Sequence, residues 1–269
     1  MRICGIDIGA KNLSICLFDA ELPDIKTCNN CKRRATKKNT SGYFCTIHAK
    51  KETDTKDLPK RGMPIINNIV KWEIVNLVQE EMKEVENRKC THEGCKNKPS
   101  RQTKKDKQYY CAKHAKTLTT EHTTMKKRVV TYDLALYTKR IQNYFDLHKN
   151  TFLPCDLVVI ENQGVLNLQC KDLQVVIFTW FIFNDARVSL VSASSKLKVY
   201  SGDDREELDL KGTKKDPYKT RKTQSILHTR AMLKDKPDAI QKLDDHPTKI
   251  DDLCDSFLLG CYGTFLVSK

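Results

Sequence analysis

The sequence predicts one α/β domain that is interrupted by two cysteine-rich insertions. Apolar runs of strand length occupy residues 3–8, 13–18, 72–78, 157–161 and 188–192. Apolar residues at helical spacing occupy residues 131–147, 168–183 and 250–261. Both periodicities in one chain indicate strands and helices that share a core, and 269 residues are enough to bury one.

The first three strands are predicted to form a meander. Residues 3–8 and 13–18 flank the turn Gly9-Ala10-Lys11-Asn12, and residues 72–78 fit a third strand. The cysteine-rich segments therefore interrupt the domain once inside this meander and once after it. A long helix follows near 131–147, and Pro154 then precedes the strand at 157–161.

The helix at 168–183 is unusual because Val175 to Phe183 is apolar almost all round. A surface helix of a monomer needs a polar face, and this stretch is too short to span a bilayer. We therefore expect the sheet to bury one side and a second subunit to cover the other. The alternative cover is the cysteine-rich insertions of the same chain.

The last helix has a clear buried stripe. Its apolar residues fall at i, i+3, i+4, i+7, i+8 and i+11, namely Ile250, Leu253, Cys254, Phe257, Leu258 and Cys261. Asp252 and Asp255 are three residues apart and share a different edge of this helix.

Composition narrows the class of protein. A formal net charge of +14 favours a polyanionic partner, nucleic acid before membrane. No apolar stretch reaches the length of a membrane span, and the strand-like N-terminus leaves no room for a signal peptide. We therefore expect an intracellular, reducing location, where the 12 cysteines serve as metal ligands rather than as disulfides.

Two segments carry zinc-ligand spacing. The first, at 26–51, supplies Cys28, Cys31, Cys45 and His48. The second, at 88–117, supplies Cys90, Cys95, Cys111 and His114. Three sulfurs and one imidazole close a tetrahedral structural site without an open position. In the second segment His92 could compete with Cys90 or Cys95 as a ligand.

Both zinc segments are also basic. Six Lys/Arg and no acid lie between Cys28 and Lys50, and ten Lys/Arg and two acids lie between Arg88 and Lys116. They are either solvated surfaces of small folding units or contacts to phosphate backbones.

Four acids outside these segments form the most informative pattern. Asp7 lies in the first apolar strand, Glu161 ends the strand at 157–161, and Asp252 and Asp255 lie near the start of the last helix. A buried carboxylate is costly unless it is paired or holds a metal. We therefore expect the four to converge on hard divalent cations, as in a nuclease. Asp251, four residues from Asp255, is a further candidate.

A basic segment follows a polar loop at 202–217. We assign Lys214, Lys215, Lys219, Arg221 and Lys222 to phosphate binding, with an exposed, charged helix start as the alternative.

Together these motifs resemble the RuvC-like Holliday junction resolvases. The residues concerned are Gly5 to Asn12, Ile160-Glu161, Val191-Ser192, the basic 218–222 segment and 250–256. The nearest branch is that of poxviruses and other large cytoplasmic DNA viruses, with the fungal mitochondrial resolvases as cousins. The similarity covers most of the chain outside the zinc segments.

The resemblance implies a fold, an activity and a set of partners. The fold is RNase H-like, a mixed sheet with flanking helices, over residues 1–269 with the two zinc inserts. The activity is cleavage of branched DNA, especially four-way junctions, by a homodimer. Asp7, Glu161, Asp252 and Asp255 would hold two Mg²⁺ per active site, which Mn²⁺ is expected to replace, beside two structural Zn²⁺ per chain. A viral member would act in the host cytoplasm.

The chain departs from the resolvase pattern in two ways, and three other protein classes are alternatives. The zinc segments are not part of the compact resolvase pattern, and no aromatic residue occurs in Asn162-Gln163-Gly164-Val165 to stack on a base. A transposon-type RuvC-like nuclease shares the acids, but its zinc ligands usually lie near the final acid. A non-catalytic zinc-finger protein leaves the acids unexplained, and a sugar-kinase-type ATPase needs glycine-rich turns that this chain lacks.

Overall fold

The structure is a computed structural model that forms two compact units. One unit comprises Met1–Asn76 with Leu134–Lys269, and the other comprises Leu77–Asp133. The structure describes residues 1–22, 26–31, 33, 35–57, 63–78, 89–125, 132–202 and 217–267.

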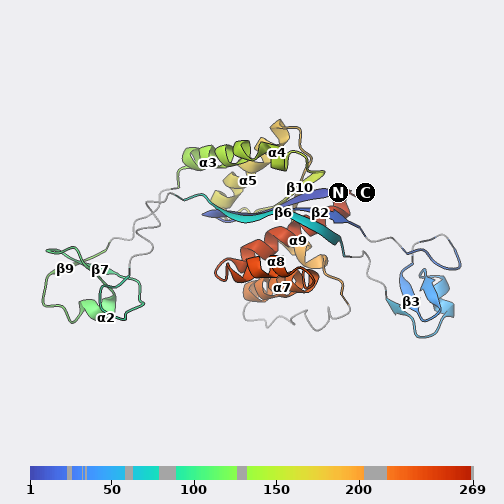
Figure 1. The fold of residues 1–269 in the computed structure, drawn as a ribbon, viewed down its shortest axis with the longest axis horizontal. Coiled ribbons are helices and arrows are strands. Elements are labelled where there is room, and N and C mark those ends of the chain that lie inside the picture. The colour runs from blue at the N-terminus through green and yellow to red at the C-terminus, as the bar shows by residue number, and fades with distance from the viewer. Residues whose placement is uncertain are drawn as a thin grey trace. The chain divides into compact units, whose positions relative to one another are not determined.

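The first unit is built on a five-stranded mixed sheet (Figure 1). Its strands are β1 (Arg2–Ile8), β2 (Asn12–Glu21), β6 (Ile65–Asn76), β10 (Leu157–Glu161) and β11 (Val188–Val191), in the order β11-β10-β1-β2-β6. Neighbours β1, β2 and β6 are antiparallel, whereas β10 and β11 run parallel to β1. This is the strand order of the RNase H-like fold, and it confirms the predicted fold class.

Helices cover both faces of this sheet. The helices are α3 (Leu134–Leu147), α4 (Lys149–Phe152), α5 (Leu168–Phe183), α7 (Pro217–Met232), α8 (Pro237–Asp244) and α9 (Ile250–Val267), and a 3-10 helix, η2 (Ala193–Lys198), follows β11. Figure 1 shows α3 and α5 on one face and α7, α8 and α9 on the other. The resulting three layers bury α9 against the centre of the sheet.

Helix α9 carries the predicted buried stripe and organises the core. Phe257 packs against Phe18 of β2 and Trp72 of β6, with ring centroids 5.6 and 5.7 Å apart. The indole nitrogen of Trp72 also donates a hydrogen bond of 3.1 Å to the backbone oxygen of Leu253. The apolar stripe thus spans three strands of the sheet.

Two glycines let the backbone of α9 approach β1 directly. A Cβ atom on Gly5 would lie 2.1 Å from the backbone oxygen of Ser256 and 2.5 Å from the backbone nitrogen of Gly260. A Cβ on Gly260 would lie 2.6 Å from Cε1 of Phe18. No other residue type fits at Gly5, so this contact sets the distance between helix and strand.

Helix α5 is covered only in part. Leu173, Ile177 and Phe181 are fully buried, and Trp180 stacks on Phe145 of α3 at 5.1 Å. The described side chains of the same unit leave Val175 at 54% and Phe183 at 83% exposure. Helix α3 therefore covers part of α5, which the sequence did not predict. An apolar strip on α5 remains exposed. None of the helices in the described ranges is both long and apolar enough to cross a bilayer.

The two inserts each contain a small antiparallel sheet and a short helix. The first consists of β3 (Lys37–Asn39), β4 (Gly42–Phe44), η1 (His48–Lys51) and β5 (Lys56–Asp57). The second consists of β7 (Arg101–Thr103), β8 (Tyr109–Tyr110), α2 (Ala112–Ala115) and β9 (His122–Thr124). The third strand of each sheet lies beyond the predicted insert ranges 26–51 and 88–117.

Several elements differ from the sequence prediction. Strand β6 begins at Ile65 rather than at residue 72, because its first half pairs with β2 through irregular register as a mostly exposed edge strand. Helix α7 was predicted only as the alternative of an exposed, charged helix start, since it is polar, and α8 was not predicted, since it has only eight residues. Most of the predicted loop, residues 203–216, lies outside the described residues.

The close approach at Gly5 predicts a sharp stability effect. We expect Gly5→Ala to lower the free energy of unfolding by about 2–3 kcal/mol, because the added methyl group meets backbone atoms that have no rotamer to change. Gly164→Ala is the matched control, since a Cβ there has no neighbour within 4 Å. Urea unfolding measures both variants, and equal stability of the two would contradict this account of the contact.

Candidate metal centre and phosphate-binding cleft

Three of the predicted acids meet at one edge of the sheet. Asp7 is the penultimate residue of β1 and Glu161 is the last residue of β10, and these strands are parallel neighbours with Ile6 opposite Ile160. Asp255 reaches the same edge from the second turn of α9. Carboxylate oxygens of all three residues lie within 4.8 Å of one another.

The three acids lie in an open cleft of about 390 Å³. Besides them, the cleft is lined by Ile8, Gly9, Ala10, Gln163, Asn167, Cys170, Ala193, Lys196, Leu197, Arg221, Lys222, Ser225 and Asp252. Residues from β1, β10, η2, α5, α7 and α9 therefore contribute to one site, as the ends of parallel strands at the sheet edge allow.

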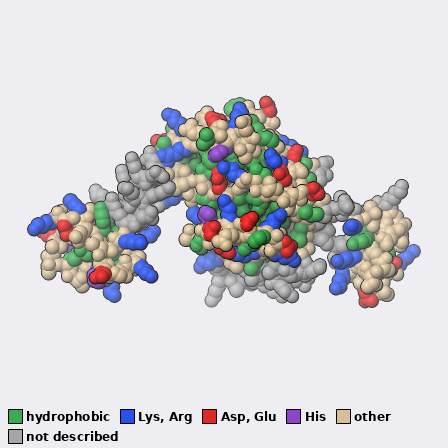
Figure 2. Space-filling view, viewed as in Figure 1, with side chains coloured by type: hydrophobic (Ala, Val, Ile, Leu, Met, Phe, Trp, Pro, Cys, Tyr) green, Lys and Arg blue, Asp and Glu red, His purple; other side chains and the backbone are tan. Residues whose placement is uncertain are grey.

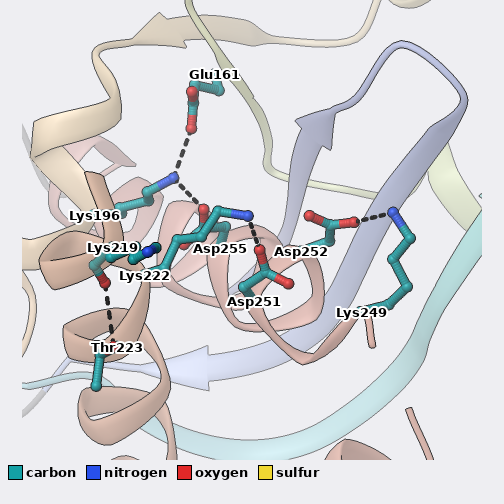
Figure 3. Close-up of polar contacts among 9 residues, drawn as sticks. All are labelled: Glu161, Lys196, Lys219, Lys222, Thr223, Lys249, Asp251, Asp252 and Asp255. Carbon is teal, nitrogen blue, oxygen red and sulfur yellow. Dashed lines mark hydrogen bonds and ion pairs between the residues drawn. The ribbon is translucent and has the colours of Figure 1, made fainter. Parts of the chain in front are cut away.

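The other two acids of α9 have different surroundings. Asp252 lines the cleft but does not join the three clustered acids, and it forms an ion pair of 3.0 Å with Lys249. Asp251 forms an ion pair with Lys222 of α7 (Figure 3). Asp251 is thus engaged in linking two helices, whereas Asp252 faces the cleft.

A lysine that the sequence reading missed lies at the centre of the site. The ammonium of Lys196 is 2.8 Å from Glu161 Oε2 and 2.5 Å from Asp255 Oδ2, and its side chain is almost fully buried (Figure 3). Lys196 comes from η2, directly after β11. The only signal in the sequence was its place a few residues after the Val191-Ser192 motif.

Burial and mutual repulsion shape the ionisation of the site. Burial raises the pKa of Asp7 well above its ordinary value, and the charges of Asp255 and Glu161 raise it further. Burial also raises the pKa of Asp255, although Lys196 opposes the change. Burial alone would lower the pKa of Lys196, but the surrounding carboxylates raise it above its usual range.

The residues of the cleft fit a divalent cation. Clustered carboxylates are the ligands that Mg²⁺ and Mn²⁺ prefer. Asp255 Oδ1 is buried, and within the described ranges no donor reaches it. The ammonium of Lys196 already places one positive charge among the three acids. A cation at this position would offset the burial and the mutual repulsion that raise the pKa values of Asp7 and Asp255.

Part of the predicted basic segment reaches the same cleft. Arg221 and Lys222 of α7 line it, so they face any phosphate bound next to the acids. Lys219 is on the same helix, and its backbone oxygen accepts a hydrogen bond from Thr223, but it does not line the cleft. Lys214 and Lys215 lie outside the described residues.

The predicted zinc ligands form two clusters, each with ligand atoms within 4.8 Å of one another. In the first, Nδ1 of His48 lies 3.3 Å from the sulfur of Cys28 and 3.5 Å from that of Cys45. In the second, Nδ1 of His114 lies 3.4 Å from Cys90 and 3.6 Å from Cys111. The remaining sulfurs follow the same pattern, with Cys31 3.8 Å from Cys45 and Cys95 4.0 Å from Cys111.

The thiols of these clusters differ in pKa. At Cys31 and Cys95, backbone hydrogen bonds lower the pKa, but burial and the neighbouring cluster thiols outweigh them and raise it. Burial raises the pKa of Cys28, but hydrogen bonds from the backbone at Cys45 and Asn30 outweigh it and bring the pKa to about 6. A backbone hydrogen bond at His114 is the largest influence that lowers the pKa of Cys111. A lowered pKa favours the thiolate, which is the form that binds zinc.

The structure distinguishes the two histidines of the second insert. His114 joins the cluster, whereas His92 does not. Instead, the ring of His92 stacks on that of His114, with centroids 3.8 Å apart and planes 16° apart. His92 therefore packs against the ring of the candidate ligand His114 and is not itself part of the cluster.

Comparisons with known proteins agree with the sequence motifs. Residues 3–134 match the family model described as mitochondrial resolvase Ydc2 / RNA splicing MRS1, which confirms the resemblance to resolvases. The matched range includes Asp7 and both inserts and ends before Glu161 and Asp255. A search of curated proteins finds no match.

Two solved structures are similar over the length of the chain. RuvC of Thermus thermophilus in complex with a Holliday junction substrate has 9% identity and a TM-score of 0.43, with 100% of this chain and 96% of that chain covered. The fowlpox virus resolvase in complex with Holliday junction DNA has 15% identity and a TM-score of 0.45, with 100% of both chains covered.

The raised pKa of Asp7 predicts how stability depends on pH. Because its pKa is higher in the folded state, ionised Asp7 opposes folding, and stability falls as pH rises from about 3.8 through the raised value. We expect Asp7→Asn to raise the melting temperature at pH 7.5 without Mg²⁺ by at least about 2 °C and to weaken stabilisation by Mg²⁺. Calorimetry gives the melting temperature without Mg²⁺ and at Mg²⁺ concentrations that increase in 10-fold steps, which tests both expectations. Asp235→Asn, at an exposed carboxylate outside the cleft, is the control, and a gain there equal to that of Asp7→Asn would refute the assignment.

Proposed function

We propose that this chain is a member of the resolvase family and a metal-dependent endonuclease that cleaves four-way DNA junctions. The observation that carries the proposal is the convergence of Asp7, Glu161 and Asp255 in one cleft with Lys196, Arg221 and Lys222. The family match over residues 3–134 and a net charge of +14 support DNA as the substrate.

Asp7, Glu161 and Asp255 would hold divalent cations, with Asp252 completing the ligand set. We propose two Mg²⁺ per active site, replaceable by Mn²⁺. Such ions lower the pKa of a bound water and stabilise both oxygens of an in-line phosphoryl displacement. The carboxylates must be ionised to bind them, which the raised pKa of Asp7 makes harder at low pH.

The basic side chains of the cleft would bind the phosphate groups of the DNA. Arg221 and Lys222 line the approach to the acids, where each can neutralise a phosphate next to the scissile bond. Lys196 contacts two of the acids and would orient Glu161 and Asp255 before the substrate arrives. With a cation bound to these carboxylates, the Lys196 ammonium would be available to a phosphate in the same cleft.

Cleavage is expected to depend on the acids to different degrees. Asp7→Asn and Glu161→Gln should each lower the cutting rate at least about 10³-fold, because several kcal/mol of charge stabilisation is lost. Asp252→Asn should cost more than Asp251→Asn, since Asp252 faces the cleft and Asp251 pairs with Lys222. The assay follows labelled four-way junction, duplex and single-stranded DNA, with Mg²⁺ or with EDTA.

Binding of the junction without metal separates catalysis from affinity in this assay. Asp7→Asn should bind the junction at least as tightly as the unaltered protein, because it removes a negative charge. Near-normal cutting by Asp7→Asn or Glu161→Gln would exclude the carboxylate trio as the metal site. Cutting of duplex DNA as fast as of the junction would exclude junction selectivity.

We also propose that each insert holds one structural Zn²⁺. Three thiols and one imidazole per cluster leave no open position for a substrate. The same clusters require reduced thiols, in keeping with an intracellular location.

Elemental analysis is expected to find two zinc ions per chain. Cys45→Ser and Cys111→Ser should each reduce this value to about one, since each removes a thiolate from a different cluster. Cys155→Ala is the control, because Cys155 is buried and belongs to neither cluster. A zinc content near zero in the unaltered protein, purified without chelator, would refute both sites.

A homodimer completes the proposed enzyme. A four-way junction presents two equivalent strands, and a two-fold dimer matches that symmetry. The exposed apolar strip on α5, which includes Val175, Ile182 and Phe183, is the surface we assign to the subunit contact. It borders a groove of about 320 Å³ between α3 and α5.

Light scattering at micromolar concentration is expected to give about twice the chain mass of 31.0 kDa. Val175→Glu combined with Phe183→Glu should yield monomers, because two charges would be buried in an apolar contact. Ile65→Glu, at a residue equally exposed as Val175 but on β6, should leave the mass unchanged. A protein that stays monomeric even with junction DNA bound would exclude the dimer.

A further inference from the structure

We propose that the side-chain amide of Gln163 donates a hydrogen bond to a phosphate oxygen of the DNA next to the metal centre. This contact rests on the proposed function, because it adds a substrate-binding group to the same cleft. Two observations carry it: the amide nitrogen of Gln163 is buried without an acceptor, and its backbone is fixed by helix α5.

Gln163 lies directly beside the acids. It follows Glu161, the last residue of β10, by two positions, and it lines the cleft together with Glu161 and Asp255. Its Nε2 atom is buried, and among the residues that the structure describes no acceptor lies within hydrogen-bonding distance of it. A buried donor without an acceptor is unfavourable and rare in folded proteins. A ligand that supplies the acceptor accounts for such a group at this position.

The backbone of Gln163 is held in place from two sides. Its N–H donates a 2.7 Å hydrogen bond to Oε1 of Gln174, a residue of α5 that is 2% exposed. Lys171 of α5 donates to the same oxygen at 3.3 Å and to Oδ1 of Asn162 at 3.0 Å. The N–H of Asn162 donates to the backbone oxygen of Val191 in β11 at 2.7 Å. These bonds fix the start of the Gln163 side chain before any ligand binds.

Other side-chain amides that begin α5 are engaged within the protein. Nε2 of Gln169 donates a 2.8 Å hydrogen bond to the backbone oxygen of Ala10, in the turn after β1. Nδ2 of Asn167 donates to the sulfur of Cys170 at 3.0 Å. The open donor of Gln163 is therefore a property of that residue and not a general feature of the cleft wall.

The charges of the cleft identify the acceptor as a phosphate oxygen. An amide N–H needs an oxygen acceptor, and Arg221 and Lys222 in the same cleft favour an anionic one. The clustered acids favour a metal ion, which a phosphate can contact at the same time. Glutamine side chains are among the usual donors to DNA phosphates. Because its amide is neutral, Gln163 would orient the phosphate, whereas Arg221 and Lys222 attract it.

Stability separates a substrate contact from a structural role. Gln163→Leu replaces the amide by an apolar group of similar size. Because the lost donor has no acceptor among the described residues, we expect the melting temperature to stay the same or to rise. Gln174→Leu removes the acceptor of the Gln163 N–H and should lower the melting temperature by at least about 2 °C. Calorimetry of the full chain without DNA measures both variants.

DNA affinity should change in the opposite direction. Gln163→Leu should weaken binding of four-way junction DNA about 5–10-fold at every salt concentration, because a hydrogen bond to a charged group is lost. The slope of log K against log salt should stay unchanged, since no charge is removed, whereas Arg221→Gln should lower that slope by about one. Gln241→Leu, at an exposed residue of α8 outside the cleft, is the control and should change neither quantity.

These affinities are measured with Ca²⁺ in place of Mg²⁺. Ca²⁺ also takes carboxylate ligands, so the acids hold a cation, and denaturing gels verify that the DNA stays intact. Methylphosphonates placed one at a time around the branch point then locate the phosphate. At one position the effect of the methylphosphonate should be at least about 3-fold smaller in Gln163→Leu than in the unaltered protein, because both changes remove the same hydrogen bond.

The outcomes distinguish this contact from the proposed function. If the unaltered chain neither binds nor cuts four-way junctions with Mg²⁺, the proposed function is wrong and the contact is wrong with it. If the unaltered chain binds the junction, the contact alone is overturned by any of three results. These are equal affinity of Gln163→Leu, a loss of melting temperature equal to that of Gln174→Leu, or additive effects of Gln163→Leu and the methylphosphonate at every position.

Discussion

The backbone contact between β1 and α9 is the constraint on which the site depends. Gly5 and Gly260 allow the helix to lie directly on the strand, so that residues a turn before the contact project past the end of β1. Asp255 thereby reaches Asp7 and Glu161, although it is 248 residues away from Asp7 in sequence. A bulkier contact would move the helix outward and separate Asp255 from the other two acids.

Electrostatic frustration is the second organising feature. Three carboxylates held close together in a partly desolvated cleft repel one another, and the fold tolerates this because Lys196 offsets part of the charge. This arrangement of charge favours a cation at the site, and the stability of the surrounding sheet offsets the cost of holding the acids together. Functional centres commonly store such unfavourable energy, and here it lies at the carboxyl edge of the sheet.

Much of this architecture could be predicted from local patterns. The apolar periods at β1, β10, α5 and α9 and the spacing of Cys and His residues are visible in the sequence because buried faces and metal ligands impose them. The neighbourhood of Lys196 could not be predicted, since it arises from a short 3-10 helix whose direction only tertiary packing sets. The cover that α3 provides for α5 was missed for the same reason, as no periodicity shows which helix faces which.

The positions of the inserts bear on how the chain folds. Glu21 of β2 pairs with Ile65 of β6 across the first insert, and Ile3 of β1 pairs with Leu157 of β10 across both. Closing a flexible loop costs entropy that grows with its length, by about 0.6 kcal/mol for each doubling. An insert already folded around its metal shortens the flexible part of these loops. If each insert binds the proposed Zn²⁺, metal binding would therefore favour the pairing of strands that carry no candidate zinc ligand, and chelation would slow refolding of the sheet.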